Sequence, residues 1–447
     1  MSNILINNAT IVNEGRSFIG SLLINDEEIA AIGNIPPEKI PANTEIIDAK
    51  GLLLLPGIID DQVHFREPGL THKGDIFTES GAAVAGGVTS FMDMPNTNPQ
   101  TVTVSALEDK YTIASEKSLI NYSFNIGATN DNLEEVLKAD PAKVCGIKIF
   151  MGSSTGNMLV DNEKSLRELF RNAHMIISSH CEDEATVRKN SEFYRQKYGE
   201  DVPIEMHSLI RSREACFISS SYAIRLASEY NTKLHIFHLS TADEMKLFSN
   251  ELPLREKRIT AEVCVHHLWF DDTDYARLGT RIKWNPAIKT KYDRDALQEA
   301  VRNNLIDVIA TDHAPHTLEE KSGTYFKAPS GGPLVQHSLV IMMELWHKKI
   351  FSIEKIVEKM CHNPAILFNI RNRGFIREGY KADIVLVDPD KSWTISRDNI
   401  LYKCGWSPFE GETFRSRVVK TIVNGTIVYD EGRIAEDYRG QRLMFDR

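Results

Sequence analysis

Short runs of apolar and β-branched residues alternate with longer amphipathic stretches through the middle of the chain. Eight such runs can be counted between residues 57 and 315. Their alternation predicts a parallel sheet with helices outside it, and eight repeats favour a closed (β/α)8 barrel over an open sheet. The runs are 57–65, 89–96, 121–129, 146–151, 175–183, 233–241, 259–267 and 307–315.

The two ends of the chain carry a different pattern. The first part contains short strand-like runs separated by Asn, Gly and Pro, and β-branched runs return at 382–390 and 418–432, where Asn424 and Gly425 form a hairpin signal. Both ends are therefore predicted to build one sheet around a central insertion. The domains expected are a sheet domain of residues 1–54 and 371–447 and a barrel of residues 55–370.

Polar residues of kinds that bind metals and move protons lie near the ends of these runs, where barrel enzymes place their catalytic groups. In the first run Asp60, Gln62, His64 and Arg66 occupy alternate positions, and residues two apart on a strand face the same side. We expect these four side chains to point into one cavity.

Two later runs end in histidine, at His180 and His238. Imidazole is a good ligand for zinc, but a single histidine at a strand end is more often structural. Ligand-type residues at the ends of several separate strands favour a metal site instead.

The segment at 310–316 contains Asp312, His313 and His316. If the backbone stays extended, Asp312 and His316 share one side and His313 faces the other. A carboxylate here can bind a metal and accept a proton, which hydrolysis requires, whereas the alternative is a helix cap. We predict a catalytic Asp312 and a packing role for His313.

Lys148 lies within an apolar run, where a charged ammonium is costly to bury. Burial lowers the pKa of a lysine, and a neutral amine can add carbon dioxide to form a carbamate with two oxygens able to bridge metal ions. From the residue type alone, a structural lysine in a salt bridge is the favoured interpretation over a metal-binding carbamate.

Composition narrows the classes of function. The 447 residues are 42% hydrophobic and 26% charged, which is typical of a globular protein. A net charge of -10 without a basic cluster argues against nucleic acid, and six scattered cysteines suggest neither disulfides nor a cysteine zinc site. No signal segment or long apolar stretch is present, so a cytoplasmic protein without a membrane partner is expected. Glycine-rich stretches at 152–156 and 330–333 fit loops at the barrel mouth better than nucleotide loops.

Several motifs together resemble the dihydroorotases of the amidohydrolase superfamily, and the likeness spans nearly the whole chain. The motifs lie at 56–69, 94–99, 146–152, 285–289 and 310–316. The resemblance implies a (β/α)8 barrel with a β-sandwich domain formed by both chain ends. It also implies the reversible cyclisation of N-carbamoyl-L-aspartate to (S)-dihydroorotate plus water, a step in the biosynthesis of UMP.

Site roles follow from the same resemblance, position by position. It implies zinc ligands, a bridging carbamylated lysine, a catalytic aspartate and substrate contacts. The metal ligands are His64, Lys148 (carbamylated), His180, His238 and Asp312, and the catalytic residue is Asp312. The substrate contacts are His64, Arg66, Asn96, Asn285, His316 and Gly331.

One position departs from the family pattern, because Gln62 stands where the first histidine of an HxH motif is expected. An amide oxygen is a weaker zinc ligand than imidazole, so we expect one firmly held zinc and a second, labile metal.

Two alternatives stay open. The first is a hydantoinase or dihydropyrimidinase, against which Arg66 and Asn96 argue. The second is a noncatalytic homologue that partners a transcarbamoylase. Gln62 suggests it, but only one expected ligand is replaced, and a noncatalytic site would be expected to lose more. The sequence fixes neither the direction of flux nor the oligomeric state, and it is compatible with a homo-oligomer.

Overall fold

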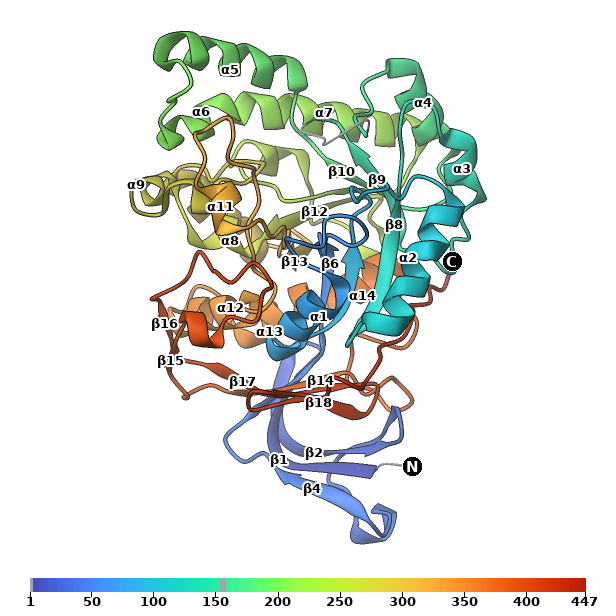
Figure 1. Ribbon diagram of the computed structural model, residues 1–447. Coiled ribbons are helices and arrows are strands. Elements are labelled where there is room, and N and C mark those ends of the chain that lie inside the picture. Colours follow the sequence, from blue (N-terminus) through green and yellow to red (C-terminus); the bar gives the residue numbers. More distant parts are fainter. Residues whose placement is uncertain (1–2, 153–157) are drawn as a thin grey trace.

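Eight parallel strands lie side by side at the centre of the molecule, in the order in which they occur along the chain (Figure 1). The computed structural model describes residues 3–152 and 158–447, so most of the expected loop at 152–156 lies outside the described residues. The strands are β6 (Ile58–Val63), β7 (Val88–Asp93), β8 (Asn121–Gly127), β9 (Gly146–Phe150), β10 (Ile177–His180), β11 (Leu234–Ile236), β12 (Ile259–Cys264) and β13 (Val308–Ala310). Each overlaps one of the predicted runs, and the predicted fold class is confirmed.

Contacts between the first and last strands close the barrel. The backbone N–H of His64 donates to the carbonyl of His313 at 2.7 Å. The backbone N–H and hydroxyl of Thr311 donate to the carboxylate of Asp60 at 3.2 and 2.6 Å, and burial still raises the pKa of Asp60 to about 7. The expectation that Asp60 points into the cavity with its neighbours is therefore wrong. Its side chain instead binds Thr311 at the seam, the line where the first and last strands of the barrel meet.

Helices connect the strands and surround them (Figure 1). They are α1 (Ile76–Ala85), α2 (Val104–Lys117), α3 (Leu133–Lys138), α4 (Glu163–Asn172), α5 (Glu184–Tyr198), α6 (His207–Ile210), α7 (Arg213–Tyr230), α8 (Val265–Trp269), α9 (Tyr275–Leu278), α10 (Lys291–Arg302), α11 (Leu318–Lys321), α12 (Ser338–His347), α13 (Ile353–Val357) and α14 (Asn363–Phe368).

Capping residues fix the start of several of these helices. Asp183 accepts a hydrogen bond from the backbone of Thr186 at the start of α5, and Thr290 forms a capping box with Asp293 at the start of α10. Because a cap satisfies backbone N–H groups that have no partner within the helix, it fixes where the helix begins. The cap at Asp183 thereby fixes the short connection between β10 and α5.

Strands from both chain ends form a nine-stranded sheet beside the barrel, where the blue and red strands meet in Figure 1. The strands are β1 (Asn3–Asn13), β2 (Arg16–Asn25), β3 (Glu28–Gly33), β4 (Thr44–Asp48), β5 (Leu53–Pro56), β14 (Ile384–Asp388), β17 (Arg417–Val423), β18 (Thr426–Asp430) and β19 (Arg433–Ile434), with a separate pair β15 (Trp393–Thr394) and β16 (Thr413–Phe414). Asn424 and Gly425 have positive φ values of 46° and 75° and form the predicted hairpin turn between β17 and β18.

Residues from both ends pack into one buried cluster within this sheet, including Ile11, Leu54 and Ile384. Part of the C-terminal region also contacts the barrel, since the indole N–H of Trp406 donates to the carbonyl of His316 at 2.7 Å. The exact domain boundaries at 54/55 and 370/371 stay predictions.

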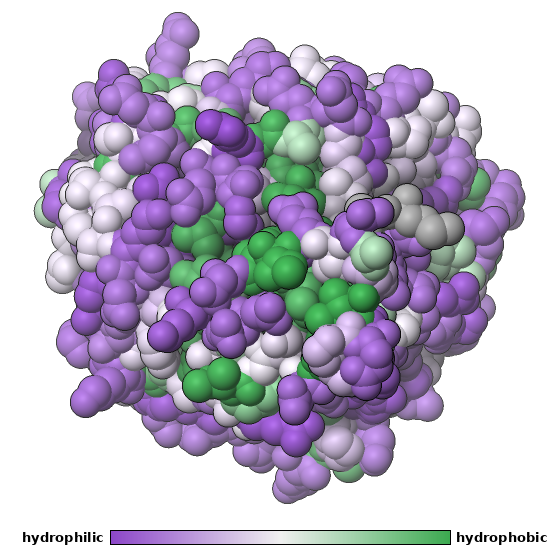
Figure 2. Space-filling view, turned by 90° about the horizontal axis from the view of Figure 1, so that it is seen from below, coloured by the Kyte–Doolittle hydropathy of each residue, from purple (hydrophilic) through white to green (hydrophobic). Residues whose placement is uncertain are grey.

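The surface seen from below is mainly hydrophilic, with hydrophobic areas gathered near its centre (Figure 2). Exposed apolar side chains include Ile19 on β2 and Ile46 on β4. Within the described ranges, no helix combines the length and apolar character needed to cross a bilayer. All six cysteines carry free thiols, as the sequence predicts.

We predict that Thr311→Val destabilises the fold by about 1–3 kcal/mol, because it removes a hydrogen bond from the buried carboxylate of Asp60. Urea unfolding followed by circular dichroism measures the change. The control is Thr112→Val, where the lost hydroxyl is exposed. A midpoint for Thr311→Val equal to that of the control would contradict a structural role for the seam.

Candidate active site

A cavity of about 420 Å³ opens at the carboxyl ends of the barrel strands. Every predicted site residue lines it: Gln62, His64, Arg66, Asn96, Lys148, His180, His238, Asn285, Asp312, His316 and Gly331. The remaining lining residues were not predicted: Leu70, Lys73, Phe150, Trp284, Ala314, Pro329 and Ser330. A larger cavity of about 720 Å³, lined partly by α4, α5 and α7, contains none of the predicted residues.

His180 and His238 bring two ring nitrogens together. Nδ1 of His180 lies 2.9 Å from Nε2 of His238, and Nε2 of His180 lies 2.9 Å from a carboxylate oxygen of Glu182. The carboxylate accepts the Nε2 proton, which leaves a lone pair on Nδ1. Burial lowers the pKa of both histidines, so both rings are neutral and able to bind a cation.

Glu182 holds the ring of His180 from behind the cavity. Arg211 donates to the same carboxylate oxygen at 2.7 Å. Burial alone would raise the pKa of Glu182, but Arg211 and His180 outweigh it and the pKa lies below its ordinary value. A carboxylate in this place fixes both the tautomer and the orientation of a metal-binding histidine.

The backbone at His238 has a left-handed conformation, with φ of 41°. Its N–H donates to a carboxylate oxygen of Glu262 at 3.0 Å, which holds the residue in this uncommon conformation. In the described part of the chain, the buried Nδ1 of His238 has no hydrogen-bond partner.

Lys148 is buried on β9, and its ammonium nitrogen lies 4.7 Å from the ring of Phe150 and 4.3 Å from that of Phe237. Among the described residues no carboxylate oxygen lies within 4.0 Å of this nitrogen. Burial lowers the pKa of Lys148 to about 8. The salt-bridged structural lysine that residue type alone favoured is therefore wrong, and the lowered pKa makes a neutral fraction of the amine available near neutral pH.

His64 and Asp312 form a second pair of donor atoms. Nδ1 of His64 lies 2.7 Å from the amide oxygen of Asn96, which can only accept, so the ring proton is on Nδ1. Its Nε2 lone pair then faces the carboxylate of Asp312 at 3.1 Å. Two lone pairs at this distance repel unless a proton or a cation lies between them. Asp312 reaches the cavity through a turned backbone with φ of 50°, not through the extended one considered above.

These donors fit the metal that the predicted set implies. Imidazole nitrogens with orienting partners, a carboxylate and a buried amine converge on one cavity, and such N and O donors suit zinc. Gln62 also lines this cavity, and its side-chain oxygen accepts from the thiol of Cys264 at 3.6 Å.

One wall of the cavity carries an unpaired positive charge. The guanidinium of Arg66 is buried; Nε donates to the carbonyl of Pro315 at 3.0 Å, and Nη2 lies 3.1 Å from Nε2 of His316. Over the ranges described, no carboxylate oxygen lies within 4.0 Å of its nitrogens. Burial lowers the pKa of Arg66 only to about 10, so the charge persists at neutral pH.

Two further predicted residues flank this wall. The amide oxygen of Asn285 is buried and, among the residues described, lacks a hydrogen-bond partner. Gly331 has φ of 124°, and a Cβ there would lie 2.6 Å from the carbonyl oxygen of Ala314. Only glycine therefore lets the backbone of this loop approach the cavity so closely.

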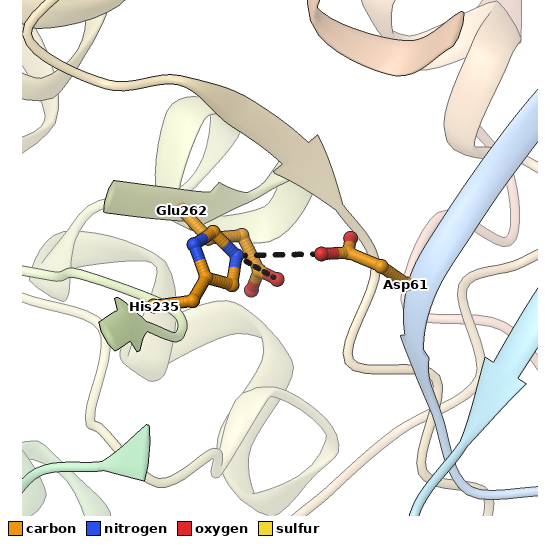
Figure 3. Close-up of side chains that lie close together, drawn as sticks. All are labelled: Asp61, His235 and Glu262. Carbon is orange, nitrogen blue, oxygen red and sulfur yellow. Dashed lines mark ion pairs between the residues drawn. The ribbon is translucent and has the colours of Figure 1, made fainter. Parts of the chain in front are cut away.

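Beneath the site lies a buried ion cluster of Asp61, His235 and Glu262, in which both carboxylates point to one imidazole (Figure 3). Nε2 of His235 lies 3.3 Å from Asp61 and 3.5 Å from Glu262. Burial lowers the pKa of His235, but the two carboxylates outweigh it and raise the pKa to about 9. Burial, together with the nearby Asp61, also raises the pKa of Glu262 to about 8, so the imidazole and the carboxylates titrate as one group. Although these donor atoms lie within 4.8 Å of one another, as metal ligands would, the cluster serves the site through Glu262, which holds His238.

The fold and this cavity define a class, the hydrolases that place metal-binding groups at the carboxyl ends of barrel strands. Comparison with known proteins agrees, because residues 53–428 match the Amidohydrolase family. The chain belongs to this family.

Similar sequences carry the name dihydroorotase. That of Methanosphaera stadtmanae is 32% identical over 97% of this chain and 98% of its own length. That of Methanosarcina mazei is 34% identical over 92% of this chain and 91% of its own.

Similar solved structures carry other names. They include the L-hydantoinase (dihydropyrimidinase) of Arthrobacter aurescens, with a TM-score of 0.93, 25% identity and coverage of 99% of this chain and 100% of its own. The dihydropyrimidinase of Brevibacillus agri NCHU1002 has a TM-score of 0.88, 26% identity and coverage of 100% of both chains.

Two residues that support the site were missed in the sequence. Glu182 lies two positions after His180, so the same alternation that linked Gln62 and His64 could have indicated it. Lys73 lies in the loop between β6 and α1, where no periodic signal exists.

We predict that Glu182→Gln weakens zinc binding about 10- to 100-fold, because an amide orients His180 less strongly than a carboxylate does. Competition with a chromophoric chelator measures the affinity, and circular dichroism checks the fold. Glu192→Gln, at an exposed position on α5, is the matched control. Equal zinc affinity in the two variants would remove Glu182 from this role.

Proposed function

We propose that the protein acts as a dihydroorotase, interconverting N-carbamoyl-L-aspartate and (S)-dihydroorotate in the cytoplasmic synthesis of pyrimidines. Its similarity to archaeal dihydroorotases over nearly the full chain supports this. The observation that carries the proposal is the buried guanidinium of Arg66, which faces the cavity and, in the part of the chain that the structure describes, has no carboxylate partner. Dihydroorotate carries a carboxylate, and dihydrouracil and hydantoin do not.

Substrate contacts follow from the lining of the cavity. Arg66, with its planar fork of donors, binds the substrate carboxylate by parallel hydrogen bonds, and Asn96 and His316 complete that end. The amide of Asn285 and the backbone at Gly331 lie against the ring and orient it. The ring amide is thereby directed toward Asp312.

Zinc would be held by His64, Lys148, His180, His238 and Asp312. When bound, such a metal polarises a carbonyl and lowers the pKa of water. The neutral form of the Lys148 amine would add carbon dioxide and release a proton, and the resulting carbamate would supply oxygen ligands for zinc. Asp312 takes a proton from the attacking water and passes it to the leaving ring nitrogen in hydrolysis, and the reverse in cyclisation.

A hydantoinase or dihydropyrimidinase is the second candidate, favoured by the close structural similarity to such enzymes. Fold similarity alone does not decide the substrate, because many activities share this barrel. A neutral ring substrate would leave Arg66 buried beside it without an anion, which is unfavourable.

Turnover of L-dihydroorotate by the zinc-loaded protein, compared with dihydrouracil, hydantoin and allantoin, tests the proposal. Selective consumption of dihydroorotate supports it, whereas preference for a neutral ring would establish the second candidate. Turnover of none, by protein that holds zinc, would favour a noncatalytic partner of a transcarbamoylase.

We predict that Arg66→Lys raises the KM for dihydroorotate about 10- to 100-fold, because a lysine keeps the charge but loses the paired hydrogen bonds. Steady-state kinetics measures the change. Arg188→Lys, at an exposed position on α5, is the control. An unchanged KM in Arg66→Lys would show that the guanidinium does not bind the carboxylate.

We predict that the native protein keeps one zinc firmly and a second metal weakly, since Gln62 supplies an amide where an imidazole would bind better. Gln62→His should then retain more metal through gel filtration, as measured by elemental analysis. Two zinc ions retained by the native protein would refute the labile second site.

A further inference from the structure

Lys73 lines the cavity from the loop between β6 and α1 and is absent from the roles given above. Its ammonium nitrogen lies 3.0 Å from Nδ1 of His316 and 3.1 Å from a carboxylate oxygen of Glu320. The side chain is 14% exposed, so it is largely enclosed between the cavity and α11. Lys73 therefore contacts a residue of the carboxylate-binding wall directly.

This contact fixes the proton of His316. An ammonium can only donate, so Nδ1 of the ring must accept, and the neutral ring then carries its proton on Nε2. The carbonyl of Ser330 lies 3.1 Å from Nε2 and accepts that proton. Both ring nitrogens are thus satisfied in one tautomer.

The same tautomer determines what Arg66 can do. Nη2 of Arg66 lies 3.1 Å from Nε2 of His316, but two donors cannot form a hydrogen bond. The Nη2 hydrogen that is directed at Nε2 then meets an N–H and not a lone pair, so Arg66 has no acceptor there and this hydrogen is available to another one. In the other tautomer, Nε2 of His316 would accept a hydrogen bond from Nη2 of Arg66. One guanidinium donor would then be occupied within the protein and unavailable to a substrate.

The surroundings keep His316 neutral. Burial is the main cause that lowers its pKa well below the ordinary value, and the cations Arg66, Lys73 and Lys321 lower it further. The hydrogen bond to the backbone of Ser330 opposes them. The nearest oxygen of Glu320 is 3.5 Å from Nδ1, beyond a good hydrogen bond, and accepts from the backbone of Thr317 at 3.0 Å. An imidazolium is therefore disfavoured, and the choice lies between two neutral tautomers.

We propose that Lys73 is a positioning residue that selects the Nε2–H tautomer of His316 and so reserves the Arg66 guanidinium for a substrate carboxylate. It thereby sets the preference for ring substrates that carry an acid group. The kinetic consequence rests on the proposed function, whereas the tautomer is a property of the protein itself.

Nitrogen NMR of the zinc-loaded protein tests the tautomer without any activity, since protonated and unprotonated ring nitrogens resonate far apart. His316→Gln assigns the signals. We expect Nε2 of His316 to be protonated in the native protein and the proton to move toward Nδ1 in Lys73→Met. Lys73→Arg keeps a donor and should restore the native pattern.

Kinetics with dihydroorotate supplies the second readout. Lys73→Met should raise KM about tenfold with little change in kcat, because one hydrogen bond to the carboxylate is lost, and Lys73→Arg should recover most of it. The control Lys403→Met removes an ion pair to Asp75 outside the cavity, and its KM should equal that of the native protein.

The outcomes separate the two proposals. A native Nδ1–H tautomer, or one that Lys73→Met leaves unchanged, overturns this inference whatever the substrate. The predicted tautomer shift without turnover of dihydroorotate would instead overturn the proposed function and keep the positioning role.

Discussion

A buried guanidinium with no carboxylate oxygen within 4.0 Å among the described residues is the constraint on which the proposed function depends. Removing a charge from water is costly unless an opposite charge or strong hydrogen bonds replace the water. Arg66 has the carbonyl of Pro315 and a ring edge of His316, but it lies open to the cavity on its remaining side. In the proposed function a substrate anion would complete the pairing, so the charge that is unfavourable in the free protein would contribute to the affinity for the substrate and to its orientation.

The rest of the site is arranged around this end of the cavity by the barrel. Closure of the seam through Asp60 and Thr311 brings the ends of the first and last strands together, and with them His64 and Asp312. A buried ion cluster below supports the backbone of His238. The similarity to hydantoinase structures thus reflects a shared scaffold, and we propose that the positively charged wall at Arg66 determines the substrate.

Much of this could be predicted from the sequence. Alternating apolar runs predicted the barrel, and polar residues at their ends predicted much of the lining of the cavity, because strand periodicity and parallel order depend on local pattern. Asn285 and Gly331 came only from the family resemblance. The prediction for Asp60 was wrong because its side chain binds Thr311, directly after the last strand of the barrel. The alternation of residues along one strand does not show which side chains bind a neighbouring strand. The isolation of Lys148 and the contact of Lys73 with His316 depend on residues far apart in the chain, so no local signal contains them.

The most direct measurement compares kcat/KM for L-dihydroorotate with that for its methyl ester, which keeps the ring and removes the charge. The account predicts that the acid is preferred by about a hundredfold or more, since the ester leaves Arg66 without an anion. Equal values for the two compounds would contradict it, because they would show that the Arg66 guanidinium does not bind the substrate carboxylate.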